Sequence, residues 1–232
     1  MAMTRAHPDN QLLKEFAAGS LDSVVAALLS AHVSSCPDCS NALRVEEACL
    51  ADTLLEEDDS VKDLSPALGE QDFVTLLNQI TSSEPQPIEP SRQSVEIRVQ
   101  GELIKLPAVL SVFVDLAGHW QSVVGNLWQK AVSGHGAPYQ IDFIYMEAGG
   151  KIPQHTHRGR EYTLVLQGSF SDELGDYGVG DLVVRDGVDE HTPYSDEGCL
   201  CLAVIDAPLY FTAGLARLLN PFSRFFFKSE AI

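Results

Sequence analysis

The chain has 232 residues, which is room for one domain of about 130–150 residues and a smaller module. Its 15 Lys and Arg stand against 33 Asp and Glu, so the net charge is −18. Such a field repels a phosphate backbone, and direct nucleic-acid binding is therefore not expected. No uncharged apolar stretch approaches the roughly 18–20 residues of a spanning helix, and the N-terminus lacks the apolar core of a secretory signal. We expect a cytoplasmic protein without a membrane segment.

The first third of the sequence has the apolar spacing of amphipathic helices. One apolar stripe covers residues 12–17 and a second covers residues 21–32, with Gly19 between them as a helix stop. Asn10 and Ser20 occupy the positions where N-caps are expected. These patterns predict two short helices joined by a tight turn.

Two more helices are predicted at residues 41–55 and 65–80, giving a bundle of about four. Residues 83–94 then contain three prolines without periodicity, which is typical of a stiff, extended linker. We place the domain boundary there, with domains at residues 1–82 and 95–232. A linker of this kind predicts that the two domains pack only loosely and that the first folds alone.

After residue 94 the hydrophobic period changes to two, as in Val95–Val99 and Tyr162–Leu166. Short strands at roughly 8–12-residue spacing favour an antiparallel sandwich or barrel. Residues 115–132 fit either an inserted helix or a bulged strand pair. The predicted fold class is α+β, a helical bundle followed by an antiparallel β-barrel.

A first metal-ligand pattern lies in the helical region. Cys36 and Cys39 form a CxxC pair that can direct two thiolates at one tetrahedral ion, and His32 lies one helical turn upstream. His7 is the candidate fourth ligand, and Cys49, at an apolar mid-helix position, is predicted to be core. Two alternatives remain: a thioredoxin-like redox pair, which no preceding strand supports, and a His32 that only ends an apolar stripe.

A second pattern lies in the strand-rich region. His155 and His157, two residues apart, project from one face of a strand, and Glu161 follows across a short turn. A later strand should supply the last ligand, and the resemblance of residues 180–191 to the second cupin motif implies that it is His191. Three imidazoles and one carboxylate suit Zn, Mn, Fe or Ni nearly equally, so the pattern predicts a metal without naming it.

Two glycines accompany these ligands. Gly168 is predicted to form the turn into the next strand. Compared with the second cupin motif, Gly187 comes one residue early and Asp186 stands in place of a proline, a departure that affects the turn more than the ligand. Cys199 and Cys201 follow on one face of a strand, either as small apolar residues or as a redox-active pair near the metal.

The N-terminal ligand pattern resembles the zinc-binding anti-sigma domain of bacterial anti-sigma factors, and residues 149–168 and 180–191 resemble the two cupin motifs. A cupin placed after such a domain resembles the ChrR family of cytoplasmic anti-sigma factors. The resemblance implies a jelly-roll barrel, zinc at the N-terminal site, and zinc or another divalent transition metal in the cupin. It also implies an extracytoplasmic-function sigma factor as partner, released when singlet oxygen or a related oxidant acts, with the Cys199 and Cys201 pair associated with that response.

We therefore expect a non-enzymatic regulator whose helical domain inhibits a sigma factor and whose cupin senses oxidative stress. The main alternative is a metal-dependent cupin enzyme, an oxygenase or isomerase, with an N-terminal zinc docking module. A cupin that stores or senses metal is a third possibility. Cupin folds host both regulators and enzymes, so the fold alone does not decide.

Overall fold

The computed structural model describes the two regions that carry the ligand patterns. The described residues are 6–56, 70–82, 94–187, 189–214, 217, 218 and 220. The predicted helix start at residue 65 and almost all of the predicted linker lie outside them. Among the described residues, no helix combines the length and the apolar character needed to cross a membrane.

Four helices come first along the chain. They are α1 (Asn10–Ala17), α2 (Ser23–Ser35), α3 (Pro37–Glu56) and α4 (Glu70–Ser82). The predicted caps are wrong: Asp9 and Asp22 cap α1 and α2, and each carboxylate accepts a backbone N–H at 2.8 Å. Asn10 is already inside α1, so its side chain is too far along the helix to cap it. Gly19 follows α1 with a φ of +64°, which confirms it as the helix stop.

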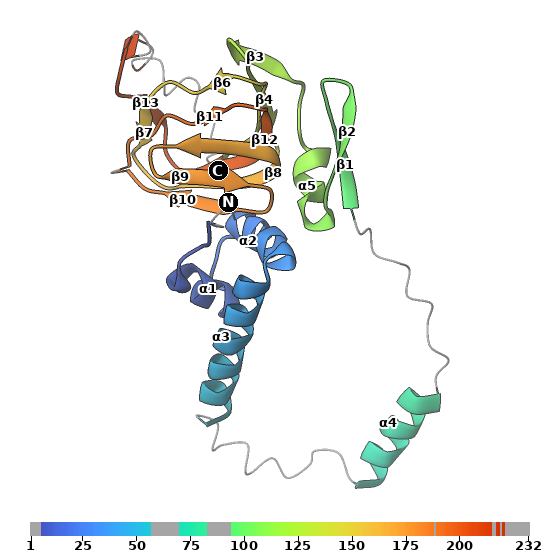
Figure 1. Ribbon diagram of the computed structural model, residues 1–232. Coiled ribbons are helices and arrows are strands. Elements are labelled where there is room, and N and C mark those ends of the chain that lie inside the picture. The colour runs from blue at the N-terminus through green and yellow to red at the C-terminus, as the bar shows by residue number, and fades with distance from the viewer. Residues whose placement is uncertain are drawn as a thin grey trace.

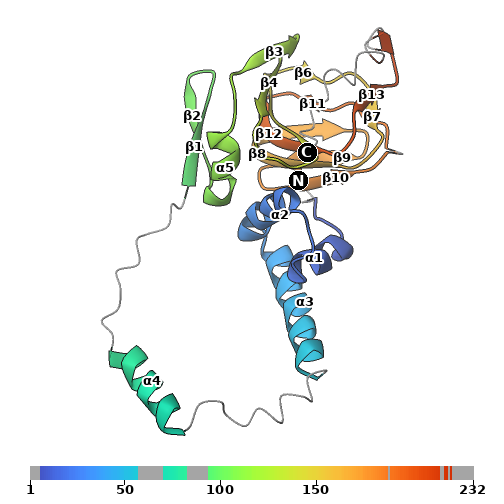
Figure 2. The same cartoon turned by 180° about the vertical axis from the view of Figure 1, so that it is seen from behind.

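The last two helices differ from their predicted environment. Cys49 is exposed on α3, so its predicted place in the core is wrong. On α4 the large apolar side chains are all exposed, and Figures 1 and 2 show this helix apart from the other described elements. The first three helices, in contrast, pack together, and α2 also packs against the barrel. The apolar face of α4 therefore has no cover among the described residues.

Antiparallel strands dominate the described residues after α4, which confirms the α+β class. The strands are β1 (Ser94–Val99), β2 (Glu102–Pro107), β3 (Gln121–Val124), β4 (Leu127–Val132), β5 (Gln140–Met146), β6 (Gly150–Lys151), β7 (His155–His157), β8 (Glu161–Asp172), β9 (Gly175–Gly178), β10 (Leu182–Arg185), β11 (Tyr194–Ser195), β12 (Cys199–Ile205) and β13 (Leu209–Phe211). A curled sheet runs in the order β3-β4-β5-β12-β8-β11-β6, and β9 and β10 also pair with β8. Figure 1 shows this sheet above the N-terminal helices.

The segment at residues 115–132 is the bulged strand pair and not a long helix. A 3-10 turn at Ala108–Leu110 and the short helix α5 (Ser111–Asp115) precede it, and the register of β3 against β4 shifts between Ser122 and Val124. The predicted turn at Gly168 is wrong. This residue lies inside β8 with a φ of +69°. A Cβ there would come 2.0 Å from the Gly198 carbonyl oxygen, so the close approach of the two chains requires glycine.

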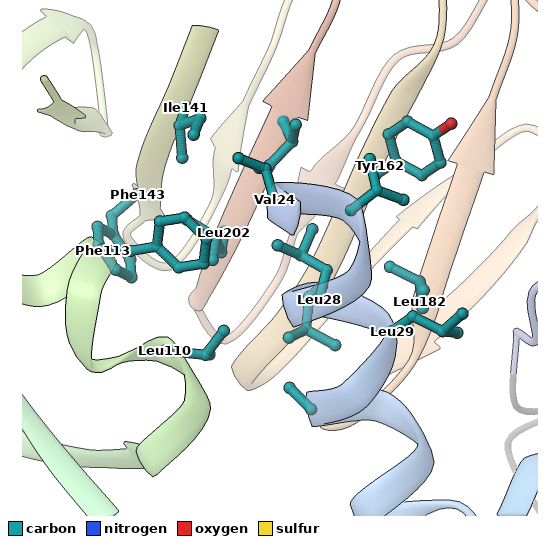
Figure 3. Close-up of a cluster of buried hydrophobic side chains, with 14 of the residues drawn as sticks. Val24, Leu28, Leu29, Leu110, Phe113, Ile141, Phe143, Tyr162, Leu182 and Leu202 are labelled. Carbon is teal, nitrogen blue, oxygen red and sulfur yellow. The ribbon is translucent and has the colours of Figure 1, made fainter. Parts of the chain in front are cut away.

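One hydrophobic core joins the N-terminal helices to the barrel. Val24, Leu28 and Leu29 on α2 are buried, and Figure 3 shows them over the strands. The same cluster contains residues of the 3-10 turn, of α5 and of the barrel strands, namely Leu110, Phe113, Ile141, Phe143, Tyr162, Leu182 and Leu202. The predicted loose packing is therefore wrong, because α2 packs directly on the barrel. The proline-rich segment at residues 83–94 separates α2 from these strands in the sequence, but it does not prevent them from packing together.

Candidate metal centres

The structure brings the four residues of the N-terminal pattern together at the junction of α2 and α3. Cys36 is the C-cap of α2, and Pro37 starts α3 at the position where helices favour proline. This sharp junction returns Cys39 to within one turn of Cys36. His32 comes from the last turn of α2, and His7 comes from the segment just before α1.

The ligand atoms have the spacing of a tetrahedral site. The sulfur of Cys39 lies 3.3 Å from His32 Nε2 and 3.3 Å from His7 Nδ1, and the sulfur of Cys36 lies 3.4 Å from the same His7 nitrogen. Bonds of about 2.3 Å to sulfur and 2.0–2.1 Å to nitrogen would place such ligands about 3.5 Å apart. Two thiolates and two imidazoles are the donor set that structural zinc prefers. The residues therefore fit the ion.

Charge also favours a cation at this position. Burial raises the pKa of Cys39 to about 12, and the neighbouring Cys36 adds to the effect. A thiolate pair in this buried site is thus unfavourable without a positive charge nearby. The Cys39 backbone N–H lies 3.5 Å from the Cys36 sulfur and can donate to it. Metal binding would take the proton's place and stabilise both thiolates.

The second group of candidate ligands lies in the strand region. His155 and His157 are the two ends of β7, and both are buried. His191 exchanges backbone hydrogen bonds with His155 at 3.0 and 3.1 Å, which brings its ring beside them. Glu161 begins β8, and its Oε2 lies 2.8 Å from His157 Nε2 and 3.6 Å from His191 Nε2. All four offer ligand atoms within 4.8 Å of one another.

The electrostatics of this group suit a metal ligand set. Burial lowers the pKa of His155 to about 4 and also lowers that of His191, so both imidazoles are neutral at pH 7. Burial opposes ionisation of Glu161, but the neighbouring imidazoles, His157 first, hold its pKa below the usual range. The Pro153 carbonyl lies 2.9 Å from His155 Nδ1, leaving Nε2 to face the group. Neutral imidazoles around an ionised carboxylate fit a divalent transition metal.

The unusual turn before His191 has a steric explanation. A Cβ on Gly187 would come 2.7 Å from the His157 carbonyl oxygen, so glycine is needed where the chain passes β7. Thr156 Oγ1 donates to the Gly187 carbonyl at 3.2 Å and holds the turn from the other side. The shifted glycine therefore lets the chain pass close to β7, and the His191 ring still lies beside His155.

A small cavity adjoins the barrel ligands. Its volume is about 40 Å³, and Glu161, His191, Cys201 and Arg185 are among its lining residues. Cys199 and Cys201 are both buried, with sulfurs 4.0 Å apart. Hydrogen bonding from Cys201 lowers the pKa of Cys199, whereas the same contact and burial raise that of Cys201. Cys201 therefore lies beside Glu161 and His191, and both thiols lie within the barrel core.

Three features of these sites were not predicted. Arg185 lines the cavity and forms an ion pair with Asp172 at 3.1 Å. β13 pairs with β7 and places Phe211 opposite His155. In the N-terminal site, His32 Nδ1 lies 2.6 Å from the backbone carbonyl of Gly180. The sequence identified Gly180 only as the start of the stretch that resembles the second cupin motif. Nothing in the sequence predicts its contact with His32.

Known proteins share both parts of this architecture. Residues 115–207 match the family described as the ChrR Cupin-like domain. The anti-sigma-E factor ChrR of Cereibacter sphaeroides is 32% identical over 225 residues, which cover 95% of this chain and 98% of that protein. A crystal structure of Rhodobacter sphaeroides SigE in complex with the anti-sigma ChrR matches with a TM-score of 0.60 and 27% identity, covering 87% of this chain and 99% of the other.

Proposed function

Since this chain belongs to the family of the anti-sigma factor ChrR, we propose that it is a cytoplasmic anti-sigma factor that binds and inhibits an extracytoplasmic-function sigma factor. The observation that carries the proposal is the similarity to ChrR along 95% of the chain, combined with both metal-ligand groups. In the matching crystal structure ChrR is in complex with SigE, which supports the same class of partner for this chain.

The N-terminal site has a structural role in this proposal. His7, His32, Cys36 and Cys39 hold zinc, which supplies folding energy to a module with a limited core. The four ligands come from three places: the segment before α1, the end of α2 and the start of α3. Zinc therefore fixes the first three helices relative to one another and shapes the surface that the sigma factor contacts.

The apolar face of α4 is the second part of the proposed sigma-binding surface. Its large side chains are between 44% and 63% exposed, and they are Phe73, Val74, Leu76, Leu77 and Ile80. An amphipathic helix of this kind stabilises a complex by laying its apolar side into a groove on the partner. Residues 1–94 carry five basic and sixteen acidic residues, so they also attract a basic partner surface.

The barrel is proposed to sense an oxidant and to release the sigma factor. His155, His157, Glu161 and His191 hold zinc or another divalent transition metal, and Cys199 and Cys201 provide thiols beside it. Joining the two sulfurs would release two protons and two electrons to the oxidant, and with singlet oxygen the product is hydrogen peroxide. Such a change on β12 would act on the core that α2 shares through Leu200 and Leu202, which alternate with the two cysteines on that strand.

The size of the cavity favours this role over the enzyme alternative. Pockets for organic ligands usually measure about 300–1,000 Å³, whereas the cavity beside Glu161 and His191 measures about 40 Å³. It has room for a few water molecules or a small oxidant. A regulator that responds to a small oxidant needs no larger site.

The test is binding of the whole chain to an extracytoplasmic-function sigma factor from the same organism. Phe73→Ala combined with Leu77→Ala should weaken binding at least tenfold, since truncating buried interface anchors is costly. Asn78→Ala, on the same exposed helix, is the matched control and should bind normally. Zinc content and melting temperature should be unchanged in both. A wild-type chain that neither binds the sigma factor nor represses its promoter would overturn the proposal.

A further inference from the structure

The contact between His32 and the barrel joins residues 148 positions apart in the sequence. His32 is fully buried, and its Nδ1 lies 2.6 Å from the Gly180 carbonyl oxygen. A carbonyl only accepts hydrogen bonds, so Nδ1 must carry the hydrogen in the neutral imidazole. The lone pair is then on Nε2, the nitrogen 3.3 Å from the Cys39 sulfur. The barrel thus selects the tautomer that can bind a metal.

The carbonyl that makes this contact is held in place by its own turn. Gly180 donates to the Val165 carbonyl at 2.9 Å, and Val165 donates to the Asp181 carbonyl at 3.0 Å. Asp181 is buried, and its carboxylate accepts from the Gly178 backbone N–H at 2.9 Å. These bonds tie the turn to β8 on one side and close it on the other. Gly180 therefore presents its oxygen to His32 from a fixed position.

The end of α2 fits closely on this turn. Gly180 has a φ of +90°, and a Cβ on it would lie 3.0 Å from Ser35 Oγ. Ser35 Oγ in turn donates to the His32 carbonyl at 3.0 Å. Next to the turn, Leu182 donates its backbone N–H to the Ala6 carbonyl at 3.4 Å, and Ala6 precedes His7. The turn and the strand after it thus contact the chain at both histidines of the N-terminal site.

We propose that the turn at residues 178–181 positions His32 through the Gly180 carbonyl and so sets how tightly the N-terminal site retains zinc. This inference rests on the zinc site of the proposed function and adds a barrel residue that the ligand set does not contain. Partners of this kind orient a metal-bound histidine, and their loss typically weakens metal binding by about 10–100-fold. Gly180 is a positioning residue, since it does not touch the ion.

Gly180→Ala in the full-length chain tests the proposal. The new methyl group meets Ser35, and the positive φ adds strain, so the turn must shift and the carbonyl moves with it. Gly101→Ala is the matched control, because Gly101 has a φ of +92° and a Cβ there would meet nothing within 4 Å. Both variants carry the same type of backbone strain, but only one disturbs the contact with His32.

The readout is cadmium-113 NMR during competition with a chelator, since a site with two thiolates resonates far from one with only nitrogen and oxygen ligands. In Gly180→Ala the thiolate site should lose its ion about 10-fold or more faster than in wild type. In Gly101→Ala the rate should stay within about twofold of wild type. Equal rates in all three proteins, with Gly180→Ala folded, would overturn the proposal.

A second measurement covers the case in which Gly180→Ala does not fold. Histidine nitrogen NMR of the wild-type, metal-loaded chain should show His32 bound through Nε2, with a solvent-protected hydrogen on Nδ1. Coordination through Nδ1, or rapid exchange of that hydrogen, would overturn the proposal. Sigma-factor binding is measured separately, so its failure with an intact thiolate signal would count against the proposed function and leave the positioning role standing.

Discussion

The sulfur of Cys201 lies 4.0 Å from the sulfur of Cys199, one pleat away on β12. Both thiols are buried, and Cys201 lines the cavity that Glu161 and His191 also line. Cys201 is thus reached from the same small space as Glu161 and His191. Its oxidation would change packing inside the barrel core, where Cys199 and Cys201 contact other buried side chains.

Replacing either thiol should therefore block the response to an oxidant. Cys199→Ser and Cys201→Ser should still repress the sigma factor but release it at least tenfold less under singlet oxygen. The exposed Cys49→Ser is the control and should respond normally. Reporter transcription gives the response, and mass spectrometry of the oxidised protein locates the modified sulfur. Normal induction in both barrel variants would remove the pair from the sensing step.

Removing one N-terminal ligand should release the zinc and loosen the helices. Cys36→Ala should lose one of the two metal equivalents, together with part of the roughly 10–16 kcal/mol that zinc supplies to small zinc modules. Metal analysis and far-UV circular dichroism measure the two effects, and sigma binding should fall with them. A zinc-free Cys36→Ala chain that still binds the sigma factor at nanomolar affinity would show that zinc is dispensable.

The shared core predicts that a substitution on α2 is felt in the barrel. Leu28 is 0% exposed, so Leu28→Ala should lower the free energy of unfolding by about 2–5 kcal/mol. The only two tryptophans, Trp120 and Trp128, lie in the strand region, and their fluorescence should report the shift. Leu54→Ala, at a position 59% exposed, should change stability by no more than about 0.5 kcal/mol. A tryptophan transition identical to wild type in Leu28→Ala would mean that the helices and barrel unfold independently.

A buried carboxyl predicts the pH dependence of stability. Burial raises the pKa of Asp142, and hydrogen bonds from Gln129 and Gln140 offset the rise only in part. The folded state therefore binds this proton more tightly than the unfolded chain, whose Asp pKa is about 4. The resulting stabilisation is complete below that value and is lost as pH rises through the folded pKa.

Asp142→Asn should accordingly raise the melting temperature more at pH 8 than at pH 4, because the buried carboxyl is destabilising only in its charged form. The gain should shrink as the pH falls towards 4, where the wild-type carboxyl is protonated. Asp115→Asn, at an exposed position, should show little gain at any pH. Thermal melts between pH 4 and pH 8 check this, and a gain that grows on acidification would have the wrong sign.

Three members of each ligand group could be predicted because their spacing is local. His32, Cys36 and Cys39 lie within eight residues, and the helix end and CxxC turn place them together. His155, His157 and Glu161 are similarly close, so strand periodicity suffices. The α+β class followed from the same change of period. These patterns depend on backbone geometry that a short segment carries by itself.

The features that were missed depend on contacts between distant segments. Cys49 occupies an apolar position of its helix pattern, but its side chain is exposed on α3. Gly168 looks like a turn residue until β12 is seen passing over it. The contact of His32 with Gly180 and the seat of α2 on the barrel have no local signature at all. An apolar stripe on a helix indicates that this face is buried, but it does not indicate which element or partner buries it.

The shared core also limits how proteins of this architecture can exchange parts. A helical module transplanted onto another barrel would bring Val24, Leu28 and Leu29 to a surface that had not been shaped to receive them. The new barrel would also need a carbonyl at the position of Gly180. Recombination between relatives should therefore succeed when α2 and the strand face beneath it are inherited together. The segment that recombination can exchange as a whole is therefore set by that interface and not by the proline-rich segment in the sequence.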